Sequence, residues 1–288
     1  MQYSHDTLRQ QAKLILEAMG SSRTDAAVIS DVLVAAELRG ISSHGMIRLK
    51  DYYGLWKAGR LNTAPDIVTV HETPGTAVLD GDNSLGMLSG IKAMETAMQK
   101  ATKCGTGWVA VKGSNHYGIA GYYSMMALKH DMIGIAMTNA NPLVAPTWSI
   151  TRLLGTNPIA VAVPAGTEQP FVADFATTPI ARGKLAVMEK KGIEAPLGYV
   201  QDEQGLPSID PSVITRGGAI LPLGGDYEHG SHKGYCLGSI VDILSAVLPG
   251  AGFGPSVPPQ VCYLKPVKDA PGKGLGHFFG AIRVDAFQ

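Results

Sequence analysis

Apolar residues in the first 60 positions recur at the three- and four-residue spacing of amphipathic helices. The first such repeat follows Ser4, stops at Gly20 and consists of Leu8, Ala12, Ile15, Leu16 and Met19. Serine commonly caps helix N-termini and glycine commonly follows helix C-termini. A second repeat opens at Thr24 and runs to Gly40, and a third follows position 44. The pattern predicts three helices.

Beyond residue 65 the period of the apolar positions changes. Residues 66–71 and 76–80 read as strands joined by a Pro74-Gly75 turn, and residues 86–103 return to a helical pattern. Further strand-like runs cover 107–112, 132–138, 158–164, 171–175 and 277–284, interleaved with helical runs near 119–130, 180–191 and 233–248. We therefore expect a small helical domain over 1–65 and a domain of strands and helices over 66–288.

The third predicted helix carries a reactive combination of side chains. At about 100° per residue, His44, Arg48 and Tyr52 fall within roughly 80° of each other. The opposite side of that helix would carry Met46, Leu49, Tyr53 and Trp56. Arg48 could hold a substrate carboxylate by a two-pronged hydrogen bond while His44 exchanges a proton with a neighbouring oxygen. Alternatively, His44 only caps the helix together with Ser42 or Ser43, and Arg48 is solvated.

A second histidine occupies a turn bounded by glycines, Gly113-Ser114-Asn115-His116-Tyr117-Gly118. Glycines let backbone amides approach a ligand, and histidine titrates near neutral pH. Because the first histidine lies in a similar setting, Ser42-Ser43-His44-Gly45, we expect the two turns to form one active site.

Composition excludes several classes of protein. The 288 residues suggest about two domains, and 24 basic and 24 acidic residues cancel, so no nucleic-acid or membrane surface is expected. No long apolar run or leader peptide is apparent, which favours the cytoplasm. Three widely spaced cysteines, Cys104, Cys236 and Cys262, lack a Cys-x-x-Cys spacing, and we expect them to be buried thiols.

The usual dinucleotide fingerprint is missing. Gly105-Thr106-Gly107-Trp108-Val109-Ala110 approaches it, but this segment follows a helix and opens a strand, the reverse of a Rossmann turn. A better phosphate candidate is the predicted helix start at His232-Lys233-Gly234, although Lys233 could simply be exposed. Asp174 ends an apolar strand and could bind a cofactor or cap the next turn. His229 and His232 lack a third ligand, so no metal is expected.

Seven segments resemble, in order, the malate/L-lactate dehydrogenase family of the type without a Rossmann fold. They are Arg39-Gly40-Ile41-Ser42-Ser43-His44-Gly45 with Arg48, Ser114-Asn115-His116-Tyr117-Gly118, Leu154-Gly155-Thr156-Asn157-Pro158, Asp174-Phe175-Ala176-Thr177, Ala181-Arg182-Gly183-Lys184, His232-Lys233-Gly234-Tyr235 and Gly274-Leu275-Gly276-His277-Phe278-Phe279. The family also contains ureidoglycolate dehydrogenases, diketogulonate reductases, sulfolactate dehydrogenases and piperideine-2-carboxylate reductases. The resemblance runs from residue 4 to the last residue.

With this resemblance we expect an α+β fold with a mixed, largely antiparallel sheet. It implies a homodimeric NAD- or NADP-dependent enzyme that interconverts a small 2-hydroxy acid and its 2-oxo acid. We expect His44, polarised by Ser43, to be the acid/base, with His116 as its rival, and expect the substrate to contact Arg48, Tyr52 and Thr156. The expected cofactor contacts are His116, Tyr117, Gly118, Ile119, Ala120, Asp174, Phe175, Ala176, His232 and Lys233.

Two departures from the family keep alternatives open. Lys184 stands where some relatives carry an acid that orients the histidine, and the helical segment that usually follows the last residues is absent. Reduction of a cyclic imino acid needs the same carboxylate clamp, and an inactive family member would retain the fold. The sequence does not separate these alternatives, nor NAD from NADP.

Overall fold

The N-terminal part of the chain is helical. The computed structural model describes residues 3–287, beginning with α1 (His5–Ala18) and α2 (Arg23–Leu38). Two 3₁₀ turns, Ser42–His44 and Met46–Arg48, lead into α3 (Leu49–Lys57). The buried side chains of these helices share one cluster with Leu85 and Met87, which lie at the start of α4 (Gly86–Cys104). The helical unit is therefore packed directly onto the rest of the protein, and the expected boundary at residue 65 stays a prediction.

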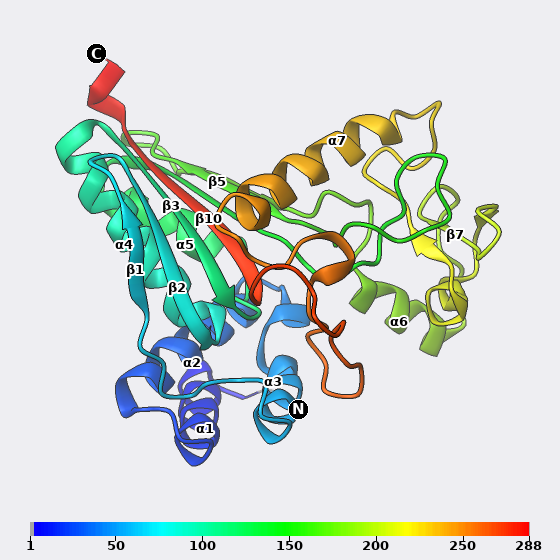
Figure 1. Ribbon diagram of the computed structural model, residues 1–288, viewed down its shortest axis with the longest axis horizontal. Coiled ribbons are helices and arrows are strands. Elements are labelled where there is room, and N and C mark those ends of the chain that lie inside the picture. The colour runs from blue at the N-terminus through cyan, green and yellow to red at the C-terminus, as the bar shows by residue number, and fades with distance from the viewer. Residues whose placement is uncertain (1–2, 288) are drawn as a thin grey trace.

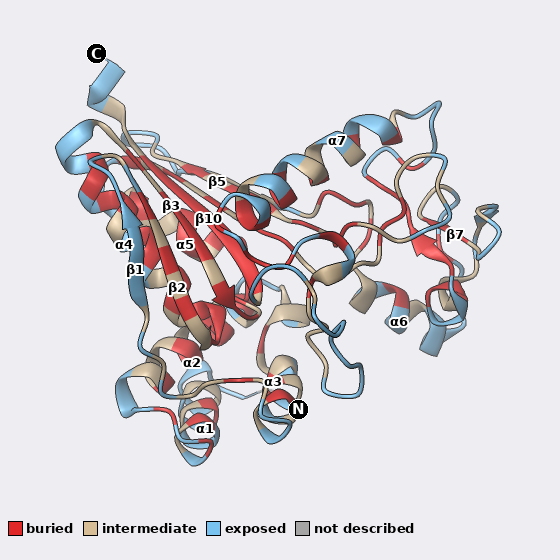
Figure 2. Ribbon diagram, viewed as in Figure 1, coloured by how far each residue is buried: buried red, intermediate tan, exposed pale blue. Residues whose placement is uncertain are grey.

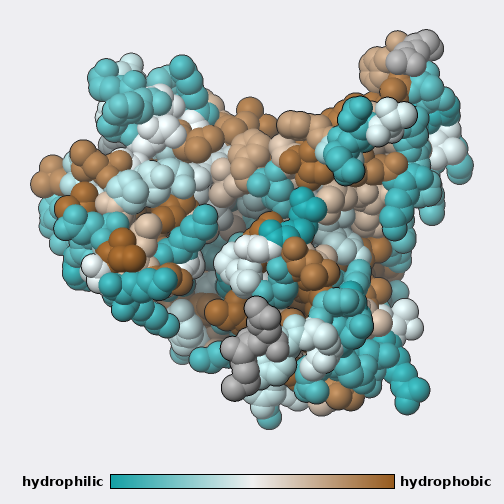
Figure 3. Space-filling model, turned by 180° about the vertical axis from the view of Figure 1, so that it is seen from behind, coloured by the Kyte–Doolittle hydropathy of each residue, from teal (hydrophilic) through white to brown (hydrophobic). Residues whose placement is uncertain are grey.

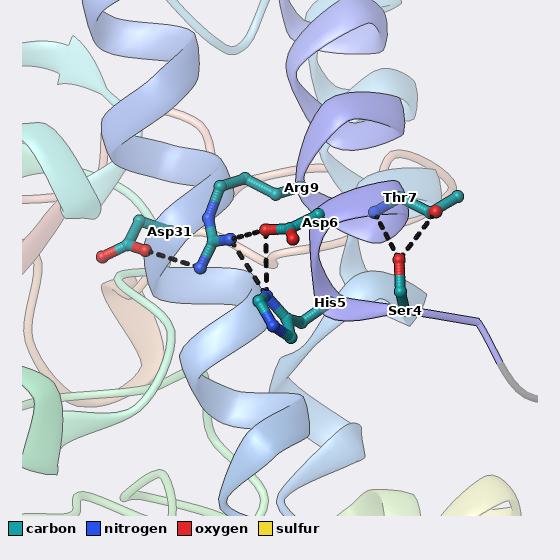
Figure 4. Close-up of polar contacts among 6 residues, drawn as sticks. All are labelled: Ser4, His5, Asp6, Thr7, Arg9 and Asp31. Atoms are coloured by element: carbon teal, nitrogen blue, oxygen red, sulfur yellow. Dashed lines mark hydrogen bonds and ion pairs between the residues drawn. The ribbon is translucent and has the colours of Figure 1, made fainter.

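Serine side chains cap the first two helices. The Ser4 hydroxyl accepts a hydrogen bond from the Thr7 backbone N–H at 3.1 Å, as its sequence position predicted (Figure 4). At the second helix the cap is Ser22, which accepts from the Asp25 backbone N–H, and the helix begins at Arg23, one residue before the expected start at Thr24.

Polar contacts connect these helices to each other and to the larger domain. Arg9 on α1 contacts Asp6 and, at 3.1 Å, Asp31 on α2 (Figure 4). Asp31 also accepts a hydrogen bond from the Tyr122 hydroxyl on α5 (Ala120–Met126) at 2.9 Å. The helical unit is thus joined to the larger domain by polar as well as apolar contacts.

The third helix differs from the sequence prediction. It begins at Leu49 because Gly45, with ψ −140°, separates the two 3₁₀ turns that precede it. A projection at 100° per residue therefore does not apply to His44, and Tyr52 lies on the buried side with Leu49 and Leu55. Tyr53, expected to pack, is 46% exposed.

A seven-stranded sheet forms the centre of the molecule, with strand order β1-β2-β3-β10-β4-β5-β6 (Figure 1). The strands are β1 (Val68–Glu72), β2 (Thr76–Ser84), β3 (Thr106–Ser114), β4 (Met132–Thr138), β5 (Ile159–Val163), β6 (Phe171–Phe175) and β10 (Leu275–Arg283). Among the described strands only β2 and β3 pair in parallel, joined by α4. The expected mixed, largely antiparallel sheet is confirmed, and a doubly wound parallel sheet is excluded.

Helices cover both faces of the sheet (Figure 1). On one face α4 packs on β2, β3 and β10, and α5 packs on β4 and β5. On the other face lie α7 (Ser231–Asp242) and the π-helical turn Ile243–Val247 that continues it. Figure 2 shows that the central strands are mostly buried, whereas the edge strand β1 is exposed.

Two glycines allow helices to approach the sheet backbone closely. A Cβ built on Gly134 in β4 would collide with the Ser124 carbonyl oxygen of α5, and one on Gly276 in β10 would collide with the Ser245 carbonyl oxygen of the π-helical turn. The cluster between α4, α5 and the sheet is correspondingly rich in alanine. Small side chains therefore set the distance between the layers.

A smaller lobe, unpredicted as a separate unit, lies beyond the edge of the sheet. It contains α6 (Arg182–Lys191) and a three-stranded sheet of order β8-β7-β9. These strands, β7 (Val200–Gln201), β8 (Pro207–Ser208) and β9 (Ala219–Ile220), have only two residues each, too few for a periodic pattern. Val200 of β7 and Ile220 of β9 join a separate apolar cluster with Val144, Leu154 and Leu185.

The expectation for the cysteines is wrong. Cys104, Cys236 and Cys262 are all exposed free thiols. Cys104 is the last residue of α4, and Cys262 lies in a surface loop.

Over residues 3–287, none of the helices combines the length and apolar character that crossing a membrane requires.

Substituting Gly134 tests the close approach of α5 to the sheet. We expect Gly134→Ala to lower the free energy of unfolding by about 1–3 kcal/mol, since two backbone segments must separate to accept one methyl group. Gly75→Ala is the matched control, because a Cβ there meets only the Thr106 carbonyl oxygen at an ordinary 3.9 Å. Urea unfolding measures both, and equal stability of the two variants would contradict this account.

Candidate active site

A cavity of about 140 Å³ brings together residues from distant parts of the chain. Seven of the side chains or backbones that line it were predicted as site residues: Ser43, His44, Arg48, His116, Tyr117, Gly118 and Thr156. Other lining residues include Thr138, Asn139, Ala140, Asn141, Leu143, Pro158, Ala181, Arg182, Gly183, Gln260, Val261 and Leu275. The volume is below the ≈ 300 Å³ of sites for drug-sized molecules and suits a small acid. The space-filling view shows a hollow near the middle of one face of the molecule (Figure 3).

The two histidine turns meet at this cavity. The imidazole rings of His44 and His116 stack with centroids 5.3 Å apart and an angle of 24° between their planes. His44 ends the 3₁₀ turn after α2, and His116 follows β3. The structure thus places both glycine-flanked histidines side by side, 72 positions apart in the chain.

Arg48 is held in place beside His44. Its Nε donates to the Ser43 carbonyl oxygen at 2.7 Å, and its Nη1 contacts an Asp51 carboxylate oxygen at 3.2 Å. The Ser43 hydroxyl lies 2.9 Å from His44 Nδ1. Burial and, to a smaller extent, the Arg48 charge lower the pKa of His44 to about 4, so this ring is neutral at pH 7.

His116 is fixed by three hydrogen bonds. Its Nδ1 lies 2.8 Å from the Tyr52 hydroxyl and accepts from the Gly118 backbone N–H at 3.3 Å. Its backbone N–H donates to Gln260 Oε1 at 3.0 Å. Because a backbone N–H can only donate, Nδ1 is an acceptor, and the neutral ring carries its proton on Nε2.

The charge state of His116 follows from its surroundings. Burial lowers the pKa of His116 well below its usual value, and Arg48, His44 and His277 add to this effect in that order. Tyr52, predicted to contact substrate, is only 1% exposed and does not line the cavity. Its hydroxyl is hydrogen-bonded to Nδ1 of the His116 ring instead.

Sequence reasoning missed the wall of the cavity formed by Gln260 and Val261. This segment is held by Arg60, which donates to the carbonyl oxygens of Val261 at 3.1 Å, Leu264 at 2.9 Å and Pro259. No local pattern relates residues about 200 positions apart. The contact joins the end of the helical unit to a loop that precedes β10.

Three predicted cofactor residues, Asp174, Phe175 and Ala176, lie outside the residues that line the cavity. Asp174 is inside β6 rather than at its end, paired with Ala160, and its Oδ2 accepts from the Gly121 backbone N–H at 2.8 Å. Burial raises the pKa of Asp174. The carboxylate thus contacts the first turn of α5, and Asp174 does not end its strand as the sequence analysis expected.

The other predicted cofactor residues fall into two groups. Ile119 and Ala120 are buried at the start of α5. His232 and Lys233 lie in the first turn of α7, where the sequence predicted a helix to start, and both are exposed. The His232 ring lies 5.2 Å from that of Tyr227. Neither group lines the cavity.

His277 is an interior histidine whose two ring nitrogens both have hydrogen-bond partners. Its side chain has no exposed surface, and its ring nitrogens lie 2.7 Å from the Thr138 and Ser114 hydroxyl oxygens. Burial lowers the pKa of His277 to about 3.

Within residues 3–287, no group of three or more His, Cys, Asp or Glu side chains is arranged so that it could hold a metal ion.

Comparison with known proteins decides the family. The family model described as malate/L-lactate dehydrogenase matches residues 3–288. The chain belongs to this family. It is therefore a dehydrogenase by family, and the resemblance drawn from its seven segments is confirmed.

Relatives with different dehydrogenase names are similar to this chain over most of its length. A malate dehydrogenase of Pyrococcus abyssi is 45% identical over 276 residues, which cover 95% of this chain and 73% of the relative. An L-sulfolactate dehydrogenase of Methanocaldococcus jannaschii is 45% identical over 81% of this chain and 65% of its own length. A ureidoglycolate dehydrogenase (NAD(+)) of Escherichia coli is 33% identical over 89% of this chain and 71% of the relative.

A solved family structure has the same fold. The malate dehydrogenase of Entamoeba histolytica superposes with a TM-score of 0.91 at 35% identity, covering 100% of this chain and 80% of that one.

The lowered pKa values of two histidines predict how the free energy of unfolding depends on pH. Unfolded histidine has a pKa near 6.5, whereas those of His44 and His277 are lowered to about 4 and about 3. Between these values the unfolded chain binds more protons, so the free energy of unfolding should fall as pH drops from about 6.5 to about 3. Urea unfolding at pH 4–7 measures this slope. His277→Gln should be less stable at pH 7 but show a shallower slope; an unchanged slope would exclude His277 as a source.

Proposed function

We propose that this chain is an NAD- or NADP-dependent oxidoreductase that interconverts a small 2-hydroxy acid and its 2-oxo acid. The observation that carries the proposal is the pair of stacked, neutral imidazoles of His44 and His116 beside Arg48 in one small cavity. Family relatives named malate, sulfolactate and ureidoglycolate dehydrogenases support the same reaction class.

Arg48 binds the substrate carboxylate in this proposal. Its contacts with the Ser43 carbonyl and with Asp51 orient the guanidinium, which therefore loses little freedom when an anion binds. The carboxylate also offsets the Arg48 charge, which is the smaller of the two causes, after burial, that lower the pKa of His44. Substrate binding therefore raises that pKa towards the neutral range, where proton exchange is most efficient. Thr156 lines the same cavity and contacts the substrate.

The two histidines take different roles because their Nδ1 partners differ. The Ser43 hydroxyl can accept from Nδ1–H of His44, which leaves Nε2 free to take the proton of the substrate hydroxyl. His116 presents Nε2–H, because Gly118 donates to its Nδ1, and stabilises the substrate oxygen by a hydrogen bond. His44 is thus the general base in the oxidation direction, and Tyr52 is a positioning residue for His116.

A bound nicotinamide cofactor would supply the hydride acceptor or donor. The residues present fit such a group. Tyr117 and Gly118 line the cavity, and Lys233 is an exposed ammonium in the first turn of α7, for which residues 3–287 provide no ion pair or hydrogen bond. Lys233 and His232 would contact a phosphate. Ile119, Ala120 and the Asp174-Phe175-Ala176 segment would frame the cofactor from α5 and β6.

A homodimer is part of the same proposal. Along α7 and the turn after it, Ile240, Ile243, Val247 and Leu248 are about half exposed or more. Contiguous exposed apolar side chains are typical of subunit contacts. A cytoplasmic location stays a prediction.

A spectrophotometric screen tests the activity. The purified protein is combined with each reduced cofactor and a panel of 2-oxo acids and cyclic imino acids, and the loss of reduced nicotinamide is followed. We expect turnover of 2-oxo acids. Turnover of cyclic imino acids alone would reassign the reaction, and cofactor binding without any turnover would identify an inactive family member.

Replacing each histidine separates their roles. We expect His44→Ala to reduce turnover by about 10²- to 10⁴-fold with unchanged cofactor binding. In the parent enzyme, kcat/KM for oxidation should rise as pH is raised through about 4 and then stay level to neutral pH. His116→Ala removes only the hydrogen bond to the substrate oxygen, so it should slow turnover less than His44→Ala does. The opposite pattern, with turnover abolished only by His116→Ala, would exchange the two roles.

The carboxylate clamp is tested by Arg48→Lys. An ammonium cannot reproduce the planar fork, so we expect KM for the acid to rise by about 10-fold or more while the cofactor dissociation constant stays within about twofold. Steady-state kinetics and fluorescence titration measure the two constants. Equal losses for acid and cofactor would remove Arg48 from the carboxylate site.

A further inference from the structure

A second guanidinium lines the cavity, and the protein does not neutralise it. Arg182 is the first residue of α6 and is partly buried at the cavity wall. Within the described chain it makes no hydrogen bond and no ion pair. By contrast, Arg48 is paired with Asp51, and Arg60 is satisfied by backbone carbonyl oxygens.

The position of Arg182 is unfavourable for the helix that carries it. A cation in the first turn lies at the positive end of the helix dipole, and the first turn of α6 contains no acidic residue. Burial lowers the pKa of Arg152, and the nearby positive charge of Arg182 lowers it further. Arg152 itself already donates to the Ile214 and Gly218 carbonyl oxygens. Local stability therefore gives no reason for arginine here.

The start of α6 adjoins the reactive end of the cavity. A Cβ built on Gly183, the residue after Arg182, would lie 3.8 Å from the Ser43 Cβ. Ser43 contacts both His44 and Arg48. Arg48 and Arg182 line the same cavity of about 140 Å³, which is small enough for one short acid to contact both.

We propose that Arg182 binds a second anionic group of the substrate, a distal carboxylate or sulfonate, and so selects 2-hydroxy acids with two acidic groups over monocarboxylic ones. This rests on the proposed function. Arg48, beside His44, binds the carboxylate next to the reacting carbon, and Arg182 pairs with the acid group at the far end of the molecule. A phosphate of the cofactor has the same chemistry as a ligand for Arg182, and the experiment separates the two sources.

The test compares Arg182→Met with Arg23→Met, a matched change at an exposed arginine on α2 that lies outside the cavity. The substrates are oxaloacetate, with two carboxylates, and pyruvate, with one. We expect Arg182→Met to lower kcat/KM for oxaloacetate by about 10- to 100-fold, the effect of losing a charged hydrogen bond. The value for pyruvate should change less than about threefold, and Arg23→Met should change neither.

Either of two outcomes would overturn the proposal. Equal losses for both substrates would mean that Arg182 does not read the distal group. A raised dissociation constant for the reduced cofactor, measured by fluorescence titration, with unchanged preference between the two acids would assign Arg182 to a cofactor phosphate. Because Arg182 makes no hydrogen bond within residues 3–287, the variant should unfold at the temperature of the parent protein or slightly above it.

A binding measurement keeps the proposal testable if no acid is turned over. Calorimetry compares succinate, a dianion, with butyrate, a monoanion of the same carbon number, in the parent protein and in Arg182→Met. Tighter binding of succinate to the parent, lost in the variant, supports the role of Arg182 even if the proposed reaction fails. Equal affinity of the parent protein for the two acids overturns it.

Discussion

Partial burial of two stacked imidazoles next to a guanidinium is the constraint on which the site depends. In water, His44 and His116 would each be partly protonated near neutral pH, and two imidazolium ions beside Arg48 would repel one another. Burial removes this problem because it lowers both pKa values and leaves the rings neutral at pH 7. The neutral rings can then stack at 5.3 Å and still present one nitrogen that accepts a proton and one that donates a hydrogen bond.

Several distant segments provide that burial. Tyr52 covers His116 from the helical unit, Gln260 binds its backbone from the loop before β10, and Arg60 holds that loop to the helical unit. The central position of β10, between β3 and β4, brings the end of the chain to the middle of the sheet. The cavity therefore exists only when the helical unit, the sheet and the late loop are packed together.

Much of the fold was predictable because it rests on local patterns. The apolar periods predicted helices followed by strands and helices, and the order of the segment at Gly105 argued against a dinucleotide turn. The family resemblance added the expectation of an α+β fold, and the structure confirms this fold class. The family was predictable from short segments in order, and the match over residues 3–288 confirms it. The meeting of the His44 and His116 turns was also expected from their common sequence setting.

The sequence alone thus determined the types of element, the family and the candidate reactive residues, because each depends on neighbours within a few positions. Only the tertiary structure decided that Tyr52 serves His116, that Gln260 and Arg182 line the cavity, and that the three cysteines are exposed. These facts depend on contacts across many residues, as between Arg60 and Val261, and on burial. Burial sets the charge of each imidazole, and it arises only when the separate segments pack into one core.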